Sequence, residues 1–207
     1  MKKFDQIFFG LILAGVFPLL LMMTSMTAWF YLDRNEARAP YCLLAGLVIG
    51  LVIDLIYFKG WLKNRYELPI SFVILIYLLY NILVYGFFMG FPAFHPLAGL
   101  VAGYYFGLRV VHQNIPTIQY PTLIRRVSMF TGLVMTAICI PSGLIGLLAH
   151  GIDKNIEGML QLGFEVTRPM LWTITSVGGV FLVAATFLLT RMAMKQTIKV
   201  ASKIYAS

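Results

Sequence analysis

Residues 7–31 read IFFGLILAGVFPLLLMMTSMTAWFY, an unbroken stretch without a single charged side chain. A helix needs about 20 consecutive apolar residues to cross the hydrocarbon core of a bilayer. The apolar region of a secretory signal peptide is shorter, about 7–15 residues. We therefore interpret this stretch, which follows Lys2 and Lys3, as a transmembrane helix and not as a signal peptide.

Five further apolar stretches follow the first. Hydrophobic residues make up 60% of the 207 residues and charged residues 12%, whereas a soluble domain carries about 25% charged residues. The mean hydropathy is +0.85. We expect an all-α polytopic membrane protein, a single domain over residues 1–207 with six transmembrane helices. The expected spans are 7–31, 41–58, 68–91, 94–111, 128–149 and 170–190.

The distribution of Lys and Arg predicts the orientation, because cytoplasmic loops are enriched in these residues. With the N-terminus in the cytoplasm, twelve of the 16 basic side chains lie on the cytoplasmic side. The other four are Arg34, Arg38, Lys154 and Arg168. A re-entrant hairpin at the glycine-rich 94–111 would leave seven inside and nine outside, so six crossings are preferred. Both termini are then cytoplasmic, and the basic pI reflects orientation, not nucleic-acid binding.

Asp54 is the only charged side chain well inside an expected span. A carboxylate at that depth costs a few kcal/mol to insert, which makes it a candidate functional residue. The helical rise places Tyr77 at the same depth and Asn81 one turn farther on, so the three can form one polar cluster. Two interpretations stand: a proton- or cation-responsive carboxylate or substrate ligand, or a hydrogen-bonded Asp that fixes helix packing.

Prolines inside two expected spans predict helix breaks. Pro18 lies in the first span, and Pro141, followed by Ser142, lies in the fifth. Each removes a backbone hydrogen bond and frees a carbonyl one turn earlier. Broken helices line the binding sites of many transporters, although inert kinks also occur in membrane proteins.

Other chemical signals are sparse. His95 and His150 end their spans on the expected outer side, where they could pair to bind a metal or sense pH, or remain single interfacial residues. Cys42 and Cys139 lie far apart in apolar surroundings and predict no redox or zinc site. No phosphate-binding loop, dinucleotide fingerprint or catalytic triad pattern is present, so no cofactor and no catalytic residue are expected.

Small residues recur every four positions at Gly99, Gly103 and Gly107, a stripe that lets helices approach closely. It predicts either contact between spans of this chain or docking of another membrane subunit. The loop 112–124 is a possible docking surface for a cytoplasmic partner. The basic tail after Arg191 is expected to be amphipathic and to rest on anionic lipid headgroups.

Transport is the expected function, as a small permease or as the membrane-embedded substrate-binding subunit of an importer for a small solute. This expectation rests on size, topology, the two prolines and Asp54, with a bacterial inner membrane as the expected location. One alternative is a non-catalytic accessory or assembly subunit of a membrane complex. Another, less favoured, is a lipid-modifying membrane enzyme, whose best polar set lacks a carboxylate. That set comprises Arg109, His112, Gln113, Asn114, Arg125 and Arg126.

Overall fold

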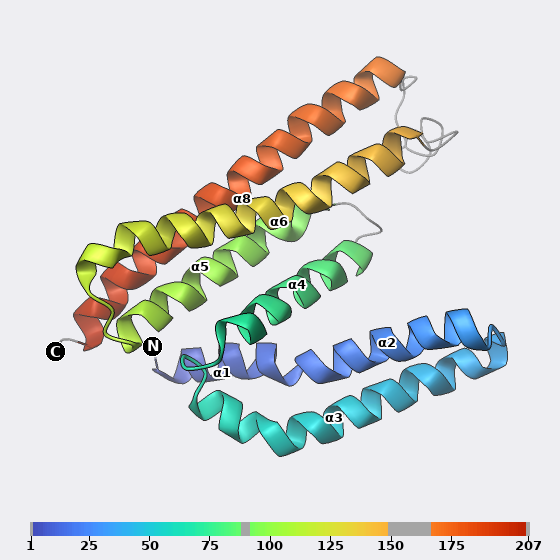
Figure 1. Cartoon of the computed structure of the whole chain (residues 1–207), viewed down its shortest axis with the longest axis horizontal. Helices are drawn as coiled ribbons and strands as arrows, with labels where there is room; N and C mark the ends of the chain where they lie inside the picture. The colour runs from blue at the N-terminus through green and yellow to red at the C-terminus, as the bar shows by residue number, and fades with distance from the viewer. Residues whose placement is uncertain (1, 88–91, 149–166, 206–207) are drawn as a thin grey trace. The chain divides into compact units, whose positions relative to one another are not determined.

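The computed structural model describes residues 2–87, 92–148 and 167–205 (Figure 1). Helices contain 92% of these residues, and no strand occurs among them. The described part of each of the six apolar stretches is mainly helical, as expected. The chain divides into two compact units, residues 1–79 and 80–207. A single domain for the whole chain stays a prediction.

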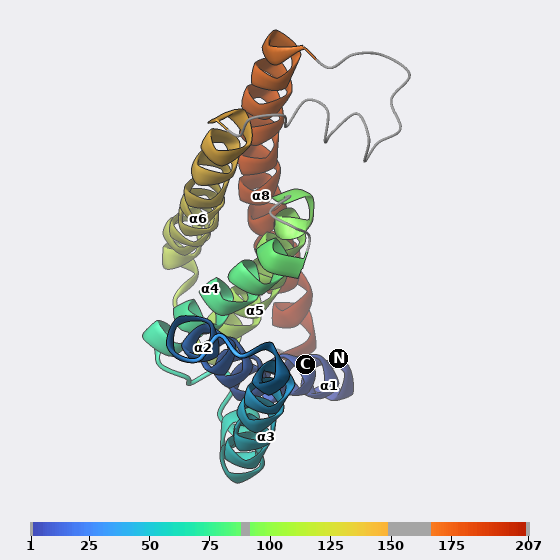
Figure 2. The same ribbon diagram turned by 90° about the vertical axis from the view of Figure 1, so that its right-hand side faces the viewer.

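The first unit is built on a helical hairpin. It contains α1 (Lys2–Ala14), α2 (Val16–Leu32), the short helix η1 (Glu36–Arg38) and α3 (Ala39–Lys63). It also contains the first half of α4 (Ile70–Phe87). In Figures 1 and 2, α2 and α3 lie side by side.

Two glycines allow α2 and α3 to touch through their backbones. A Cβ atom at Gly50 would lie 2.5 Å from the Pro18 nitrogen, and one at Gly46 would lie 2.5 Å from the Leu21 carbonyl oxygen. Neither position has room for a larger residue. Together with Asp54, one turn beyond Gly50, these glycines are the buried residues of α3, so they determine which face of α3 meets α2.

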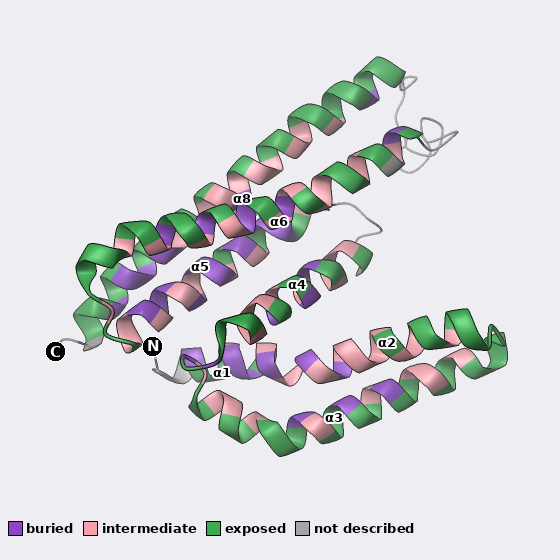
Figure 3. Cartoon of the chain, viewed as in Figure 1, coloured by how far each residue is buried: buried purple, intermediate pink, exposed green. Residues whose placement is uncertain are grey.

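The second unit is a bundle of three main helices. After the end of α4 come η2 (Pro92–Phe94), α5 (His95–His112), η3 (Thr117–Gln119), α6 (Tyr120–Leu148) and α8 (Arg168–Tyr205). Buried residues are concentrated on α5 and on the parts of α6 and α8 that surround it (Figure 3). The far ends of α6 and α8 are mostly exposed.

The glycine stripe of α5 is covered by α8 of the same chain. A Cβ atom at Gly99 would lie 2.7 Å from the Thr190 hydroxyl, and one at Gly107 would lie 2.7 Å from the Thr197 Cβ. At Gly103 the nearest atom would be the Thr190 carbonyl oxygen. Of the two roles expected for the stripe, the structure therefore shows contact within the chain, which leaves these glycines unavailable to another subunit.

The basic end of α8 has one buried apolar face and one exposed basic face, as expected of an amphipathic helix. Its apolar face includes Met194 and Ile198, which form a buried cluster with Val110 of α5 and Ile124 of α6. This apolar face is packed against the other two helices. Contact of the basic tail with anionic lipid headgroups stays a prediction. The basic side chains lie on the opposite, exposed face: Arg191, Lys195 and Lys199.

A hydroxyl pair ties the three helices together at the level of Gly99. The Thr190 hydroxyl lies 2.9 Å from the Gly99 carbonyl oxygen on α5 and 2.9 Å from the Thr131 hydroxyl on α6. It also lies 2.8 Å from the Thr186 carbonyl oxygen in its own helix. A hydroxyl has one hydrogen, so Thr190 donates to one of these groups at a time, and either hydroxyl of the pair can be the donor to the other.

Replacing Thr190 with the isosteric valine should destabilise the protein by about 1 kcal/mol, the size of an interhelical hydrogen bond in a membrane. Thr173→Val is the matched control, since the exposed Thr173 hydroxyl donates within α8, to the Pro169 carbonyl. Unfolding in detergent micelles measures both. Equal stability of the two variants would show that the hydroxyl pair contributes nothing.

Large apolar side chains lie on the outside of both units. Leu55 is 80% exposed, Leu133 65% and Val180 71%. Soluble proteins rarely expose contiguous apolar surface of this kind. Within the described ranges, four helical segments are also long and apolar enough to cross a membrane, namely Phe4–Leu32, Glu36–Lys63, Thr117–Leu148 and Arg168–Ile204. These features indicate a membrane-embedded protein whose helices contact lipid.

The expected fourth span has the weakest support. The contacts between α5 and α8 advance in the same direction along both helices. Gly99 of α5 lies beside Thr186 of α8, and Gly107, farther along α5, lies beside Thr197, farther along α8. The two helices are therefore parallel, and much of α5 lies beside the segment of α8 that follows Arg191, not beside its apolar half. Neither six crossings nor the direction of the termini is confirmed, and both stay predictions.

Candidate functional site

The first helix of the chain is interrupted at Gly15, between α1 and α2. Pro18 has no backbone N–H, so the carbonyl of residue 14 loses its usual helical donor. At the junction, the Gly15 N–H donates to the Ile12 carbonyl at 3.4 Å, and the Leu19 N–H donates to the Gly15 carbonyl at 3.1 Å. Pro18 itself lies in the first turn of α2, where a missing N–H costs little. The expected break near Pro18 is thus present in the structure.

Asp54 of α3 faces this interruption. Gly50 lies directly against Pro18, and Asp54 follows one turn later on the same face of the helix. The Asp54 side chain is only 5% exposed. The backbone N–H of Phe17, in the first turn of α2, interacts with its carboxylate. The close packing of two helix backbones therefore places the carboxylate at the start of α2.

The Asp54 carboxylate is incompletely satisfied. The Phe17 interaction falls short of a full hydrogen bond, and neither carboxylate oxygen has a hydrogen-bond partner among the described residues. The N-terminal end of α2 offers the partial positive charge of a helix terminus. A carboxylate buried without full hydrogen bonding is costly, so this group is suited to take up a proton or to accept a bond from a bound solute.

The structure shows no hydrogen bond from the other two members of the predicted polar cluster to the Asp54 carboxylate. Tyr77 on α4 is half-buried and does not hydrogen-bond to Asp54. Asn81 is buried in the second unit, where its backbone carbonyl oxygen lies 3.0 Å from His95 Nε2. The glycine contacts turn Asp54 toward α2, which the depth of a residue in a span cannot predict. A site formed by all three residues stays a prediction.

Aromatic residues next to Asp54 were missed in the sequence. The Trp61 ring stacks on Phe17 at a centroid distance of 5.3 Å and on Tyr57 at 5.7 Å. It also contacts the Phe72 ring at 5.2 Å. In the sequence, Tyr57 and Trp61 follow Asp54 by about one and two helical turns. Because aromatic residues are common near span ends, this spacing alone does not indicate a site.

A pocket of about 420 Å³ opens beside this aromatic cluster. Its lining combines aromatic rings with polar groups from the end of α3 and the segment that follows, including Tyr57, Trp61, Asn64 and Glu67. Trp61 thus forms part of the pocket wall and also stacks on Phe17, the residue whose backbone N–H reaches Asp54. The pocket wall is thus connected to Phe17 through the stacked Trp61 and Phe17 rings, and the backbone of Phe17 faces the Asp54 carboxylate.

A second polar group lies inside the other unit. His95 is only 1% exposed, and its ring contacts the Tyr85 ring at 6.2 Å. The Tyr85 hydroxyl is 3.0 Å from the Ser142 hydroxyl, which donates to the Ile138 carbonyl at 2.6 Å. Three helices, α4, α5 and α6, are joined through these contacts.

The predictions for Pro141 and for the two histidines have different outcomes. α6 continues through Pro141 without interruption, so the break expected there is wrong. A single lost backbone bond is tolerated inside a membrane helix when neighbouring groups satisfy the backbone.

His150 lies outside the described residues, so its pairing with His95 stays a prediction. Among the residues the structure describes, no three His, Cys, Asp or Glu side chains gather as a metal site would require.

Comparison of the chain with models of known protein families, with curated proteins and with solved structures gave no match. The site around Asp54 therefore has to be interpreted from its own geometry.

Proposed function

We propose that the protein is an integral membrane transport protein for a small solute, either a permease or the membrane-embedded substrate-binding subunit of an importer. The observation that supports it is the Asp54 carboxylate, buried at a helix interruption with no full hydrogen bond. Many transporters place their coupling ion or substrate at such an interruption. A bacterial inner membrane is the location we propose.

The pocket beside Trp61 supplies the second part of the proposal. A solute in this pocket contacts Trp61, and the stack onto Phe17 links it to the start of α2. Rings and a carboxylate suit a small solute with a flat or cationic part. If Phe17 moves with the Trp61 ring, its backbone N–H moves relative to the Asp54 carboxylate. Solute binding in the pocket and protonation of Asp54 are therefore coupled.

The test measures solute-driven proton movement. The purified protein is reconstituted into liposomes that contain a pH-sensitive dye, and amino acids, amines, sugars and nucleobases are added outside. We expect one solute class to drive proton entry in the wild type, and Asp54→Asn to reduce the rate by at least about tenfold. If the protein is instead an importer subunit, we expect solute binding without net flux. Binding is then measured as quenching of Trp61 fluorescence in a Trp29→Phe/Trp172→Phe variant, in which Trp61 is the remaining tryptophan.

Asp33→Asn is the matched control, because it makes the same change at an exposed carboxylate that pairs with Arg38 at 3.2 Å. Its flux should equal that of the wild type. Unchanged flux or quenching in Asp54→Asn removes Asp54 from the mechanism. If no solute in the panel moves protons or quenches Trp61, the transport proposal is overturned.

The assembly alternative has lost the observation that favoured it. The glycines that predicted docking of another subunit are covered by helices of this chain, α8 in the second unit and α2 in the first.

A further inference from the structure

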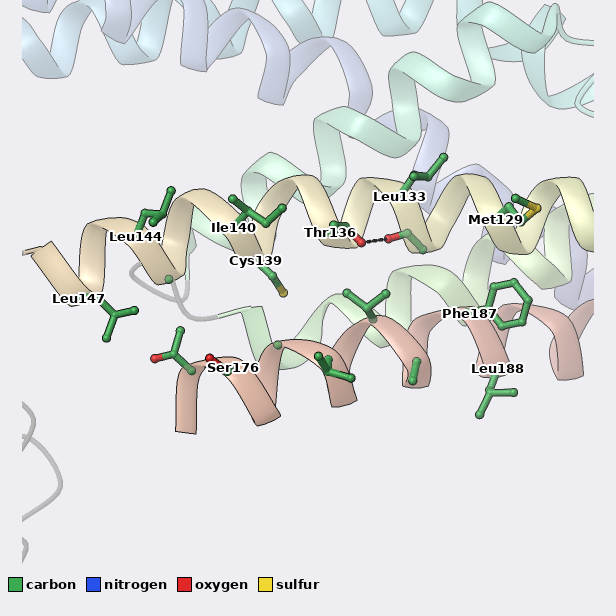
Figure 4. A pocket seen from close by; sticks show the side chains of 17 residues that line it. Met129, Leu133, Thr136, Cys139, Ile140, Leu144, Leu147, Ser176, Phe187 and Leu188 are labelled. Carbon is green, nitrogen blue, oxygen red and sulfur yellow. Dashed lines mark hydrogen bonds between the residues drawn. The ribbon is translucent and has the colours of Figure 1, made fainter. Parts of the chain in front are cut away.

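A groove of about 870 Å³ lies between α6 and α8 (Figure 4). Its walls are almost entirely apolar, with Leu133, Leu144 and Leu147 from α6 and Val180 and Leu188 from α8. The Thr136 hydroxyl on the wall already donates to the Gly132 carbonyl at 2.9 Å.

Small residues keep this groove open. A Cβ atom added at Gly179 of α8 would have the Cys139 Cβ atom 3.9 Å away, and one at Gly132 of α6 would have Phe187 at 3.8 Å. These are loose contacts, in contrast to the backbone contact at Gly103. At Gly143 the two helices are closer, since an added Cβ atom there would lie 2.8 Å from the Thr175 Cγ2 atom. The groove is thus open at Gly132 and Gly179 and narrower at Gly143.

The length of the groove is close to the thickness of the hydrocarbon core of a bilayer. Its lining on α6 extends from Met129 to Leu147, which at 1.5 Å per residue is about 27 Å. This is close to the ~30 Å thickness of the hydrocarbon core. An acyl chain is the ligand that is always present at this depth, and each buried CH₂ group contributes about 0.8 kcal/mol.

A cation lies at one end of the groove. Arg168, the first residue of α8, donates from Nη1 to the Leu147 carbonyl oxygen at 2.6 Å, and Leu147 is part of the groove wall. The Arg168 side chain is exposed and forms no ion pair with the carboxylates that the structure describes. A guanidinium has five N–H donors, so the remaining donors can bind a phosphate in bidentate fashion.

We propose that this groove binds one anionic phospholipid, with an acyl chain along the groove between α6 and α8 and the phosphate at Arg168. The site is independent of the transport proposal, since it lies in the second unit and uses none of the residues around Asp54.

The test uses two adjacent glycines of α8. Gly179→Leu fills the groove, whereas Gly178→Leu adds the same side chain at a position with no atom within 4 Å. Each purified variant is mixed with equal amounts of palmitoyl-oleoyl phosphatidylglycerol and phosphatidylcholine in detergent, and native mass spectrometry counts the lipids bound per chain. We expect one phosphatidylglycerol on the wild type and on Gly178→Leu, and at least a tenfold lower bound fraction on Gly179→Leu.

Arg168→Gln provides a second measurement that does not alter the groove. This variant should lose the preference for phosphatidylglycerol over phosphatidylcholine. Equal lipid retention in the two glycine variants would overturn the site, and so would an undiminished preference in Arg168→Gln. A lipid-free dimer of the wild type, broken by Gly179→Leu, would assign the groove to a second copy of the chain and also overturn the proposal.

Discussion

Replacing Asp54 with alanine should abolish solute-driven proton movement and at the same time raise the stability of the protein. Asp costs about 2.5–3.5 kcal/mol at the centre of a membrane helix, and the Asp54 oxygens recover little of this through hydrogen bonds. Removal of the carboxyl group should therefore stabilise the protein by about 1–3 kcal/mol. A residue that is costly for stability and essential for activity is typical of a functional site.

The opposite result would identify a structural role. If Asp54 serves mainly to cap the start of α2, its loss should cost about 1 kcal/mol, as for other helix caps. Unfolding of wild type, Asp54→Ala and the exposed control Asp33→Ala in the same micelles distinguishes the two cases. Destabilisation by Asp54→Ala, with retained proton movement, would refute the functional interpretation.

Gly103→Ala should destabilise the protein by about 3 kcal/mol or more. Its new methyl group would meet the Thr190 backbone carbonyl and lie 2.9 Å from the Ala193 Cβ atom and 3.1 Å from the Met194 nitrogen. Added methyl groups in a well-packed core cost about 1–3 kcal/mol, and here backbone atoms of α8 cannot move aside as a side chain would. Separation of α5 from α8 also breaks the hydrogen bond from Thr190 to the Gly99 carbonyl.

The matched control is Gly178→Ala in the partner helix, where no atom lies within 4 Å of the added Cβ. Alanine is the better helix former by about 1 kcal/mol, so this control should be neutral or slightly stabilising. Thermal unfolding in detergent compares the two variants. A Gly103→Ala protein as stable as Gly178→Ala would mean that α5 and α8 are not in backbone contact.

The helices themselves were predictable, but their ends were not. The described residues of the apolar stretches 128–149 and 170–190 form helix, yet α6 begins at Tyr120 and α8 continues to Tyr205. Hydropathy detects the part of a helix that matches the hydrocarbon core, and a helix can continue beyond that core on packing alone. The part of α8 after Arg191 packs against α5 and α6 through Met194 and Ile198.

Pro18 and Asp54 were both recognised in the sequence as exceptional residues, but their connection was not. The link depends on Gly50, which packs against Pro18 and turns Asp54 toward the helix interruption. Depth along a span suggested Tyr77 as the neighbour instead, because depth does not specify the direction in which a side chain points.

The sequence by itself determined that the chain is helical and membrane-embedded, that its first helix is interrupted near Pro18, and that Asp54 is its exceptional charge. These are properties of single segments, since hydrophobicity and the loss of a proline N–H act within one helix. Only the tertiary structure decided that Gly99, Gly103 and Gly107 meet α8, that Asp54 faces Phe17, and that α6 and α8 leave a groove. Such contacts depend on how two helix surfaces fit together, and the pattern of one helix does not identify its partner.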